Sequence, residues 1–88
     1  MRIRVRYVGR VQGVGFRATC RGIAARTAVT GWVRNEEDGS VLMEVQGEIE
    51  DVQKVIGEIG RVMGRFIVRI DEVEIGEAAD ERGFEVRR

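Results

Sequence analysis

The segment Gly9-Arg10-Val11-Gln12-Gly13-Val14-Gly15-Phe16-Arg17 joins an alternating apolar pattern to a helical pattern. Its three glycines allow positive φ angles and let the backbone come close to a ligand. Successive N–H groups in such a turn can converge on one anion, and the helix N-terminus that follows favours negative charge. Arg17, in the first helical turn, adds a guanidinium that can bind two phosphate oxygens. The segment therefore predicts a strand-to-helix turn that binds an oxyanion, although a tight turn that binds nothing also needs glycine.

The residues on either side of this segment have the periodicities of a strand and of a helix. Ile3, Val5 and Tyr7 alternate with arginines, which predicts a strand with one buried face. Beyond the segment, one helical face carries Phe16, Thr19, Cys20, Ile23, Ala24 and Thr27. We expect Cys20 to be a small buried residue rather than a nucleophile, because the chain has no histidine to activate it.

A hairpin and a second helix are expected next. Residues 30–35 and 41–45 are rich in β-formers and flank a turn at Asp38-Gly39, which predicts a hairpin. Residues 49–62 keep a three-and-four apolar spacing, which predicts an amphipathic helix.

Two further β patterns complete the predicted fold. Residues 66–75 predict a strand whose phase slips near Asp71-Glu72, where a bulge is allowed, and Phe84 and Val86 predict a short final strand. The order strand, helix, strand, strand, helix, strand favours two helices on one face of an antiparallel sheet, with an extra C-terminal strand. This is an α+β, ferredoxin-like α/β sandwich, in which the first and third strands lie side by side.

Length and composition narrow the range of functions. A chain of 88 residues, 43% of them apolar, predicts one domain covering residues 1–88. No run is long enough to span a bilayer and no signal-peptide pattern follows Met1, so we expect a cytoplasmic protein that does not bind membranes. One cysteine and no histidine argue against a disulfide and against a zinc or copper site.

The charges are unevenly distributed along the chain, although the net charge is zero. Residues 1–35 contain eight arginines and no acid, whereas residues 36–88 contain all fifteen acids and seven basic residues. A basic N-terminal part would attract anions to the glycine segment. Alternatively, the charges pair between neighbouring strands after folding, and the sequence leaves this open for every arginine except Arg17.

Two motifs together indicate a family. The segment 9–17, followed by Gly31-Trp32-Val33-Arg34-Asn35 and by Asp38-Gly39, resembles the acylphosphatases over essentially the whole chain. The resemblance implies a single acylphosphatase-like domain that hydrolyses the carboxyl–phosphate bond of acyl phosphates to a carboxylate and inorganic phosphate. We expect a monomeric enzyme that binds acyl phosphate and phosphate but no nucleic acid, and that uses no cofactor or metal.

The resemblance also implies which residues carry the activity. Arg17 anchors the phosphate, Asn35 holds the attacking water, and five consecutive loop residues bind the phosphoryl group through their backbone. Those five are Gln12, Gly13, Val14, Gly15 and Phe16. A carboxylate leaves without a general acid, and a neutral amide can hold water without repelling the phosphate dianion.

The chain departs from the family pattern in two places, and two alternatives remain. It has Ala28-Val29 where the family usually has Gly-Leu, which puts the end of the first helix in doubt, and it lacks a Gly-Pro-Pro segment after the second helix. An RNA-binding domain of the same fold would present aromatic rings on its open sheet face, where this first strand presents arginines. A carbamoyl-phosphate-handling module would belong to a much longer chain, whereas this one begins at Met1 and ends after the fifth strand.

Overall fold

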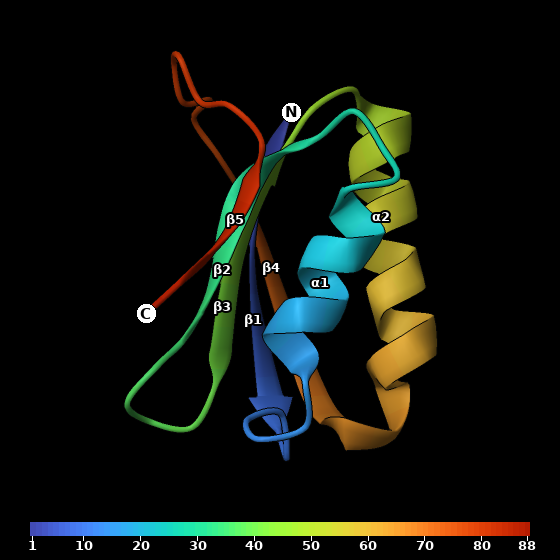
Figure 1. The fold of residues 1–88 in the computed structure, drawn as a ribbon, viewed down its shortest axis with the longest axis vertical. Coiled ribbons are helices and arrows are strands. Elements are labelled where there is room, and N and C mark those ends of the chain that lie inside the picture. The colour runs from blue at the N-terminus through green and yellow to red at the C-terminus, as the bar shows by residue number, and fades with distance from the viewer.

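Two helices cover one face of a five-stranded sheet in the computed structural model, which describes residues 1–88 (Figure 1). The elements are β1 (Arg2–Gly9), α1 (Phe16–Ala24), β2 (Thr30–Asn35), β3 (Val41–Gln46), α2 (Ile49–Met63), a 3-10 turn η1 (Gly64–Phe66), β4 (Ile67–Ile75) and β5 (Phe84–Arg87). The strand order is β4-β1-β3-β2-β5, with β1 and β3 adjacent. The ferredoxin-like α+β fold and its central strand pair are therefore confirmed.

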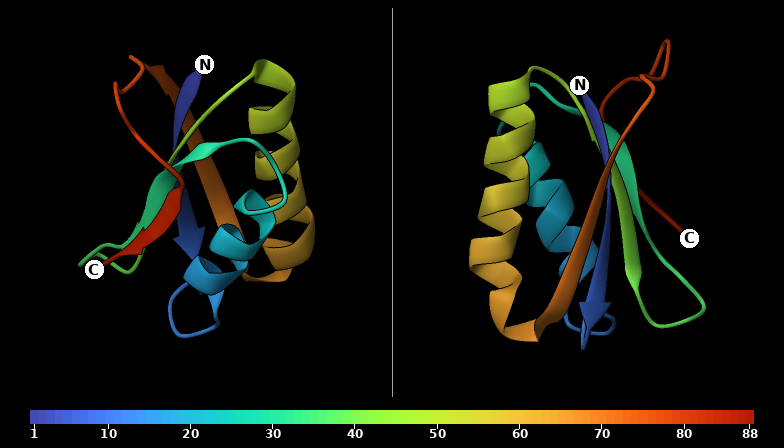
Figure 2. Two further views of the ribbon diagram at one scale, coloured as in Figure 1. Left: turned by 45° about the horizontal axis from the view of Figure 1, so that its top comes forward. Right: turned by 180° about the vertical axis from the view of Figure 1, so that it is seen from behind.

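The last strand makes the sheet mixed rather than antiparallel throughout. β5 pairs with β2 in parallel, with Phe84 opposite Gly31. The connection from β4 passes over the end of the sheet opposite the glycine segment and reaches the far edge (Figure 2). β5 follows β4 in the sequence but joins the sheet at its other edge, so its direction depends on the path of the connection. The order of the strands in the sequence therefore does not predict whether β5 is parallel or antiparallel to its neighbour.

The bulge expected at Asp71-Glu72 is wrong. These residues pair regularly with Arg6 and Val5, and the register shift lies instead between Val8 and Gly9. The phase slips because β4 is an edge strand whose residues are mostly exposed, so that apolar alternation does not report burial there. The shift at Gly9 ends the pairing and directs the chain into the loop.

The core lies between the helices and the covered face of the sheet. It includes Val5 and Tyr7 of β1, Val33 of β2, and Phe16 and Cys20 of α1. The rings of Tyr7 and Phe16 are 4.8 Å apart, which packs the start of α1 against β1. Cys20 is fully buried, as expected, and burial raises the pKa of its thiol to about 12.

The departure at Ala28-Val29 does not affect a helix cap. α1 ends at Ala24, and Ala25 has a right-handed backbone conformation with φ −64°. Two turn hydrogen bonds follow, from the Arg26 amide to Ile23 and from the Thr27 amide to Ala24. Because Ala28 adopts no positive φ, alanine is acceptable where the family has glycine. No helix in the structure is both long enough and apolar enough to cross a membrane.

Some arginines of residues 1–35 form ion pairs on the open face of the sheet. Arg2 lies 2.8 Å from Glu44 and 2.7 Å from Glu81, and Arg4 lies 2.7 Å from Glu44. Arg6 and Arg34 also have acidic partners. The other arginines of residues 1–35 form no ion pair: Arg10, Arg17, Arg21 and Arg26. Ion pairing thus accounts for half of the arginines of residues 1–35, and the other four lie on the loop, on α1 and in the turn that follows α1.

Aromatic rings are not available for stacking on that face. Trp32 is only 7% exposed. The guanidiniums of Arg34 and Arg87 each lie 4.9 Å from its ring centre. The open sheet therefore lacks the uncovered aromatic platform of an RNA-binding domain.

Candidate functional site

The loop between β1 and α1 has backbone donors without partners. Gly13 and Gly15 both adopt φ 77°, and Gly15 precedes α1 with no side-chain cap. None of the backbone amides from Gln12 to Ala18 donates a hydrogen bond within the protein. Amides at a helix N-terminus and in a left-handed turn are suited to binding an anion.

Three kinds of contact fix the position of this loop. The Arg10 amide donates to the Phe66 carbonyl at 2.9 Å, and Val11 and Phe16 are buried in the core. Gln12 Nε2 donates to the carbonyls of Glu36, at 2.8 Å, and Ser40, at 3.0 Å. The loop is therefore attached to the turn that follows Asn35.

The two functional side chains of the sequence prediction come from different elements. Arg17 lies in the first turn of α1, and its Nη1 donates to the Arg87 carbonyl of β5 at 3.4 Å. Asn35 is the last residue of β2, opposite Val41. The N-terminus of α1, the end of β2 and the end of β5 thus border one hollow.

Arg17 and Asn35 border one open hollow of about 750 Å³ that runs along α1. Gly13, Gly15 and Phe16 also line it. The other two predicted loop residues do not. Gln12 points its side chain at the β2–β3 turn, and Val14 packs against the core, so only their backbones remain available to a ligand.

The hollow is cationic and contains no acid–base pair. Its lining includes Arg17, Arg21 and Arg88 and no aspartate or glutamate. Cys20, behind it in the core, has a thiol that stays protonated near neutral pH because burial raises its pKa to about 12. No three or more histidine, cysteine, aspartate or glutamate side chains lie close enough together to hold a metal ion. The site can bind an anion and position a neutral molecule, but it offers no titrating acid or base.

Sequence reasoning missed part of this lining. Arg21 follows Arg17 by one helical turn, a spacing that could have placed both on one face. The wall formed by Val86 and Arg88, and the Arg87 carbonyl that binds Arg17, had no comparable signal. They depend on the parallel placement of β5 beside β2.

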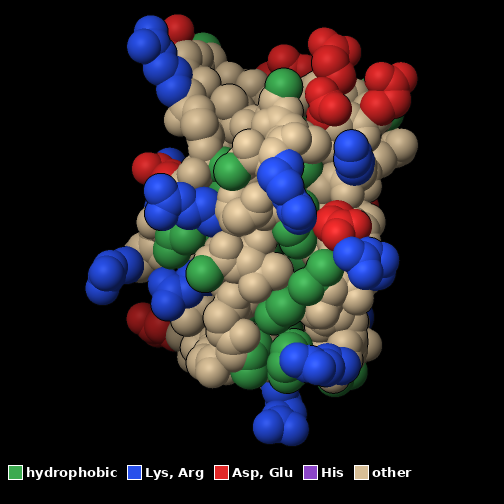
Figure 3. Space-filling view, turned by 45° about the vertical axis from the view of Figure 1, so that its right-hand side comes forward, with side chains coloured by type: hydrophobic (Ala, Val, Ile, Leu, Met, Phe, Trp, Pro, Cys, Tyr) green, Lys and Arg blue, Asp and Glu red, His purple; other side chains and the backbone are tan.

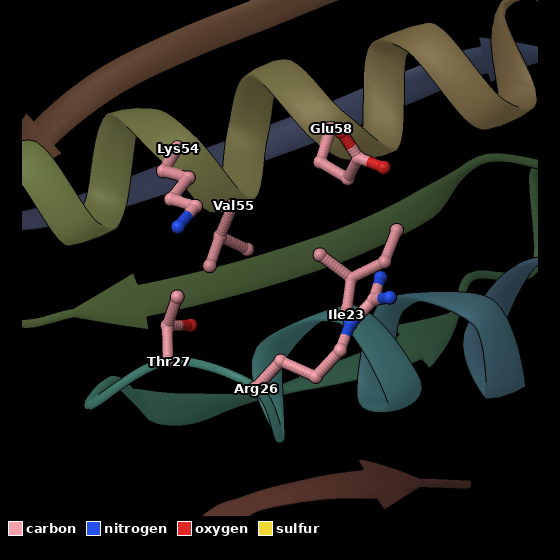
Figure 4. Close-up of a pocket in the computed structure, with 6 residues that line it drawn as sticks. All are labelled: Ile23, Arg26, Thr27, Lys54, Val55 and Glu58. Carbon is pink, nitrogen blue, oxygen red and sulfur yellow. The ribbon is translucent and has the colours of Figure 1, made fainter.

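A second hollow, of about 270 Å³, lies between α1 and α2 (Figure 4). Its lining residues are Ile23, Arg26, Thr27, Lys54, Val55 and Glu58. The Glu58 carboxylate forms an ion pair with Arg61 on its own helix, and no loop amide reaches this hollow. On the face shown in Figure 3 the acidic side chains gather mainly at the top, the end of the molecule opposite the glycine loop. The first turn of α2 carries Glu50 and Asp51.

Comparisons with known proteins show the family of this chain. Residues 3–86 match the family model described as Acylphosphatase. An acylphosphatase from Salinibacter ruber is 44% identical over 90 residues, covering 99% of this chain and 93% of that protein. The crystal structure of acylphosphatase from Bacillus subtilis superposes with a TM-score of 0.87 at 25% identity, covering 99% of this chain and 98% of that one.

A longer protein contains the same fold. The crystal structure of T. kodakarensis HypF matches with a TM-score of 0.85 at 28% identity, covering all of this chain but only 12% of that one. The family match and the full-length likeness to acylphosphatases favour the hydrolase over the module of a larger enzyme. The chain therefore belongs to the acylphosphatase family, the hydrolases that cleave acyl phosphates to a carboxylate and inorganic phosphate.

Proposed function

We propose that the loop amides and Arg17 bind the phosphoryl group of the substrate and that Asn35 positions the attacking water. One observation carries this proposal: Asn35 borders the same acid-free hollow as five loop and helix residues whose backbone amides have no partner. These are Gly13, Gly15, Phe16, Arg17 and Ala18. Fixed donors around the phosphoryl oxygens stabilise the charge that redistributes in the transition state, because they need no reorganisation.

The reaction requires no further protein group. The water oxygen forms a bond to phosphorus while the bond from phosphorus to the acyl oxygen breaks, and the carboxylate leaves with the electron pair. Asn35 Oδ1 accepts a hydrogen bond from the water and holds it in line with the breaking bond. The water proton passes to a phosphoryl oxygen of the substrate, because no carboxylate or histidine that could accept it lines the hollow.

The two residues should fail differently. We expect Arg17→Ala to weaken competitive inhibition by inorganic phosphate and to lower kcat roughly 10²-fold or more, the scale seen when one preorganised donor is removed. We expect Asn35→Ala to leave phosphate inhibition nearly unchanged while kcat falls sharply. The assay is benzoyl phosphate hydrolysis with phosphate as inhibitor. Arg26→Ala and Gln53→Ala are the controls, because they remove a guanidinium and a side-chain amide, respectively, outside the hollow.

Equal loss of phosphate inhibition in Asn35→Ala and Arg17→Ala would show that Asn35 belongs to the anion site and does not position water. Strict dependence of hydrolysis on an added divalent ion would contradict the metal-free mechanism. Either result is interpretable only for folded variants, so a thermal melt accompanies each kinetic measurement.

We also propose that residues 1–88 act as one domain, as a monomer and in the cytoplasm. One contiguous core joins both helices to the sheet. Arg17, Asn35 and the loop residues to which we assign phosphoryl binding all belong to this domain. The single cysteine is buried and unpaired, as is usual for a protein of a reducing compartment.

A further inference from the structure

We propose that the site prefers acyl phosphates whose acyl chain carries a second carboxylate, and that Arg21 binds this carboxylate. The inference rests on the proposed placement of the phosphoryl group at the loop and Arg17. It assigns the remainder of the hollow, which extends along α1 beyond Arg17, to the acyl part of the substrate.

The hollow leads from the phosphate end directly to Arg21. Its lining runs from Gly15 and Arg17 through Ala18 to Arg21, Gly22 and Ala25, along one side of α1. Arg17 and Arg21 are four residues apart, so their backbones are separated by about 6 Å along the helix axis, a length spanned by a chain of four or five carbons. A dicarboxylic acyl phosphate of that size can therefore place its phosphoryl group at Arg17 and its carboxylate at Arg21.

Arg21 is a free cation in this chain. It forms no ion pair and no side-chain hydrogen bond within the protein, whereas seven of the fourteen arginines do form ion pairs. Like charges four residues apart on a helix disfavour each other. An anion lying between Arg17 and Arg21 relieves this repulsion, and a guanidinium can bind a carboxylate through two parallel hydrogen bonds.

No acidic side chain competes for Arg21 or repels a carboxylate there. Glu36, the acid that follows Asn35, is bound by Arg34 at 2.8 Å and does not line the hollow. There is also room for the acyl chain. A methyl group built at Gly22 would meet nothing within 4 Å, so the floor beside Arg21 is open.

The test compares two substrates of equal length, glutaryl phosphate and its terminal methyl ester, which differ in one charge. The measured quantity is the ratio of their kcat/KM values. In Arg21→Gln we expect this ratio to fall about fivefold, the upper end of what one exposed charged pair contributes. Arg21→Lys keeps the charge and should recover part of the ratio. Arg26→Gln removes the same charge from the turn that follows α1, outside the hollow, and should keep the full ratio.

The outcomes separate this inference from the function on which it rests. An unchanged ratio in Arg21→Gln, or an equal fall in Arg26→Gln, would overturn the carboxylate site while leaving phosphoryl binding intact. Absence of methyl ester hydrolysis by the unmodified enzyme would instead contradict the proposed function. Because Arg21 is exposed and glutamine is a good helix former, the variant should fold, and its thermal melt verifies this.

Discussion

Gln12 should matter to catalysis although its side chain does not face the substrate. Its Nε2 donates to two carbonyls of the β2–β3 turn, at 2.8 and 3.0 Å. These are the only side-chain hydrogen bonds between the β1–α1 loop and the β2–β3 hairpin that carries Asn35. The change Gln12→Ala removes both of them and leaves all backbone donors of the loop in place.

The magnitude follows from these two bonds. A neutral hydrogen bond contributes about 0.5–1.5 kcal/mol net. Because one of these bonds is exposed and the other is partly buried, we expect the free energy of unfolding to fall by about 1–2 kcal/mol. For a chain of this size that corresponds to roughly 4–16 °C in Tm. Because the bonds fix the loop relative to Asn35, we expect kcat for benzoyl phosphate to fall about tenfold or more, since small misplacements are costly for an in-line reaction.

Thermal melts and steady-state kinetics on Gln12→Ala, beside Gln53→Ala on the exposed side of α2, measure both effects. Gln53 makes no side-chain hydrogen bond and should change neither quantity. A Gln12→Ala variant with the original Tm and kcat would refute the view that this side chain sets the distance between the phosphate loop and the water site. A lower Tm with an unchanged kcat would limit its role to stability.

Four further substitutions test the fold. The hydrogen bond from Arg2 lowers the pKa of Glu81 below its ordinary 4.5, so this pair's stabilisation is complete above that pH and is lost as pH falls through the lowered pKa. Glu81→Gln should therefore be destabilised near neutral pH and converge on the unmodified protein in acid, measured by urea unfolding at several pH values; a constant difference would contradict the assignment. Gly57→Ala should stabilise α2 by about 1 kcal/mol, because its Cβ meets nothing within 4 Å, whereas Gly31→Ala should destabilise strongly, because its Cβ would overlap a β3 carbonyl at φ 150°; thermal melts with the opposite order would exclude this explanation. Tyr7→Phe removes a buried hydroxyl that has no partner, so stability should be unchanged or rise by up to about 1 kcal/mol, and a marked loss in denaturant titration would reveal a partner for that hydroxyl.

Much of the fold could be predicted because local patterns and tertiary packing agree. The alternation of Ile3, Val5 and Tyr7 matches the buried face of β1, and the apolar spacing of residues 49–62 matches the buried face of α2. In both elements one face contacts the core, so the period of the apolar residues reports the backbone conformation. The edge strand β4 has no such contrast between faces, and there the expected bulge was wrong.

The candidate site divides in the same way. Glycines that permit φ 77° and an arginine in the first helical turn are local features, so the sequence alone predicts an anion-binding loop that ends at Arg17. The placement of Asn35 opposite that loop depends on strand order, and the Gln12 hydrogen bonds depend on how the hairpin turns. Neither arrangement follows from local sequence patterns, because the residues that it brings together lie far apart in the chain.

The sequence by itself determined the local features of this protein: a glycine-rich strand-to-helix turn, two amphipathic helices and the element order of a ferredoxin-like sandwich. The tertiary structure decided which charges remain free. Arg2, Arg4 and Arg6 are neutralised across strands, whereas Arg17 and Arg21 are left together beside an acid-free hollow. The physical reason is that a residue's own type and neighbours set its backbone preference, but its electrostatic partners come from strands and helices that only folding brings within a few ångströms.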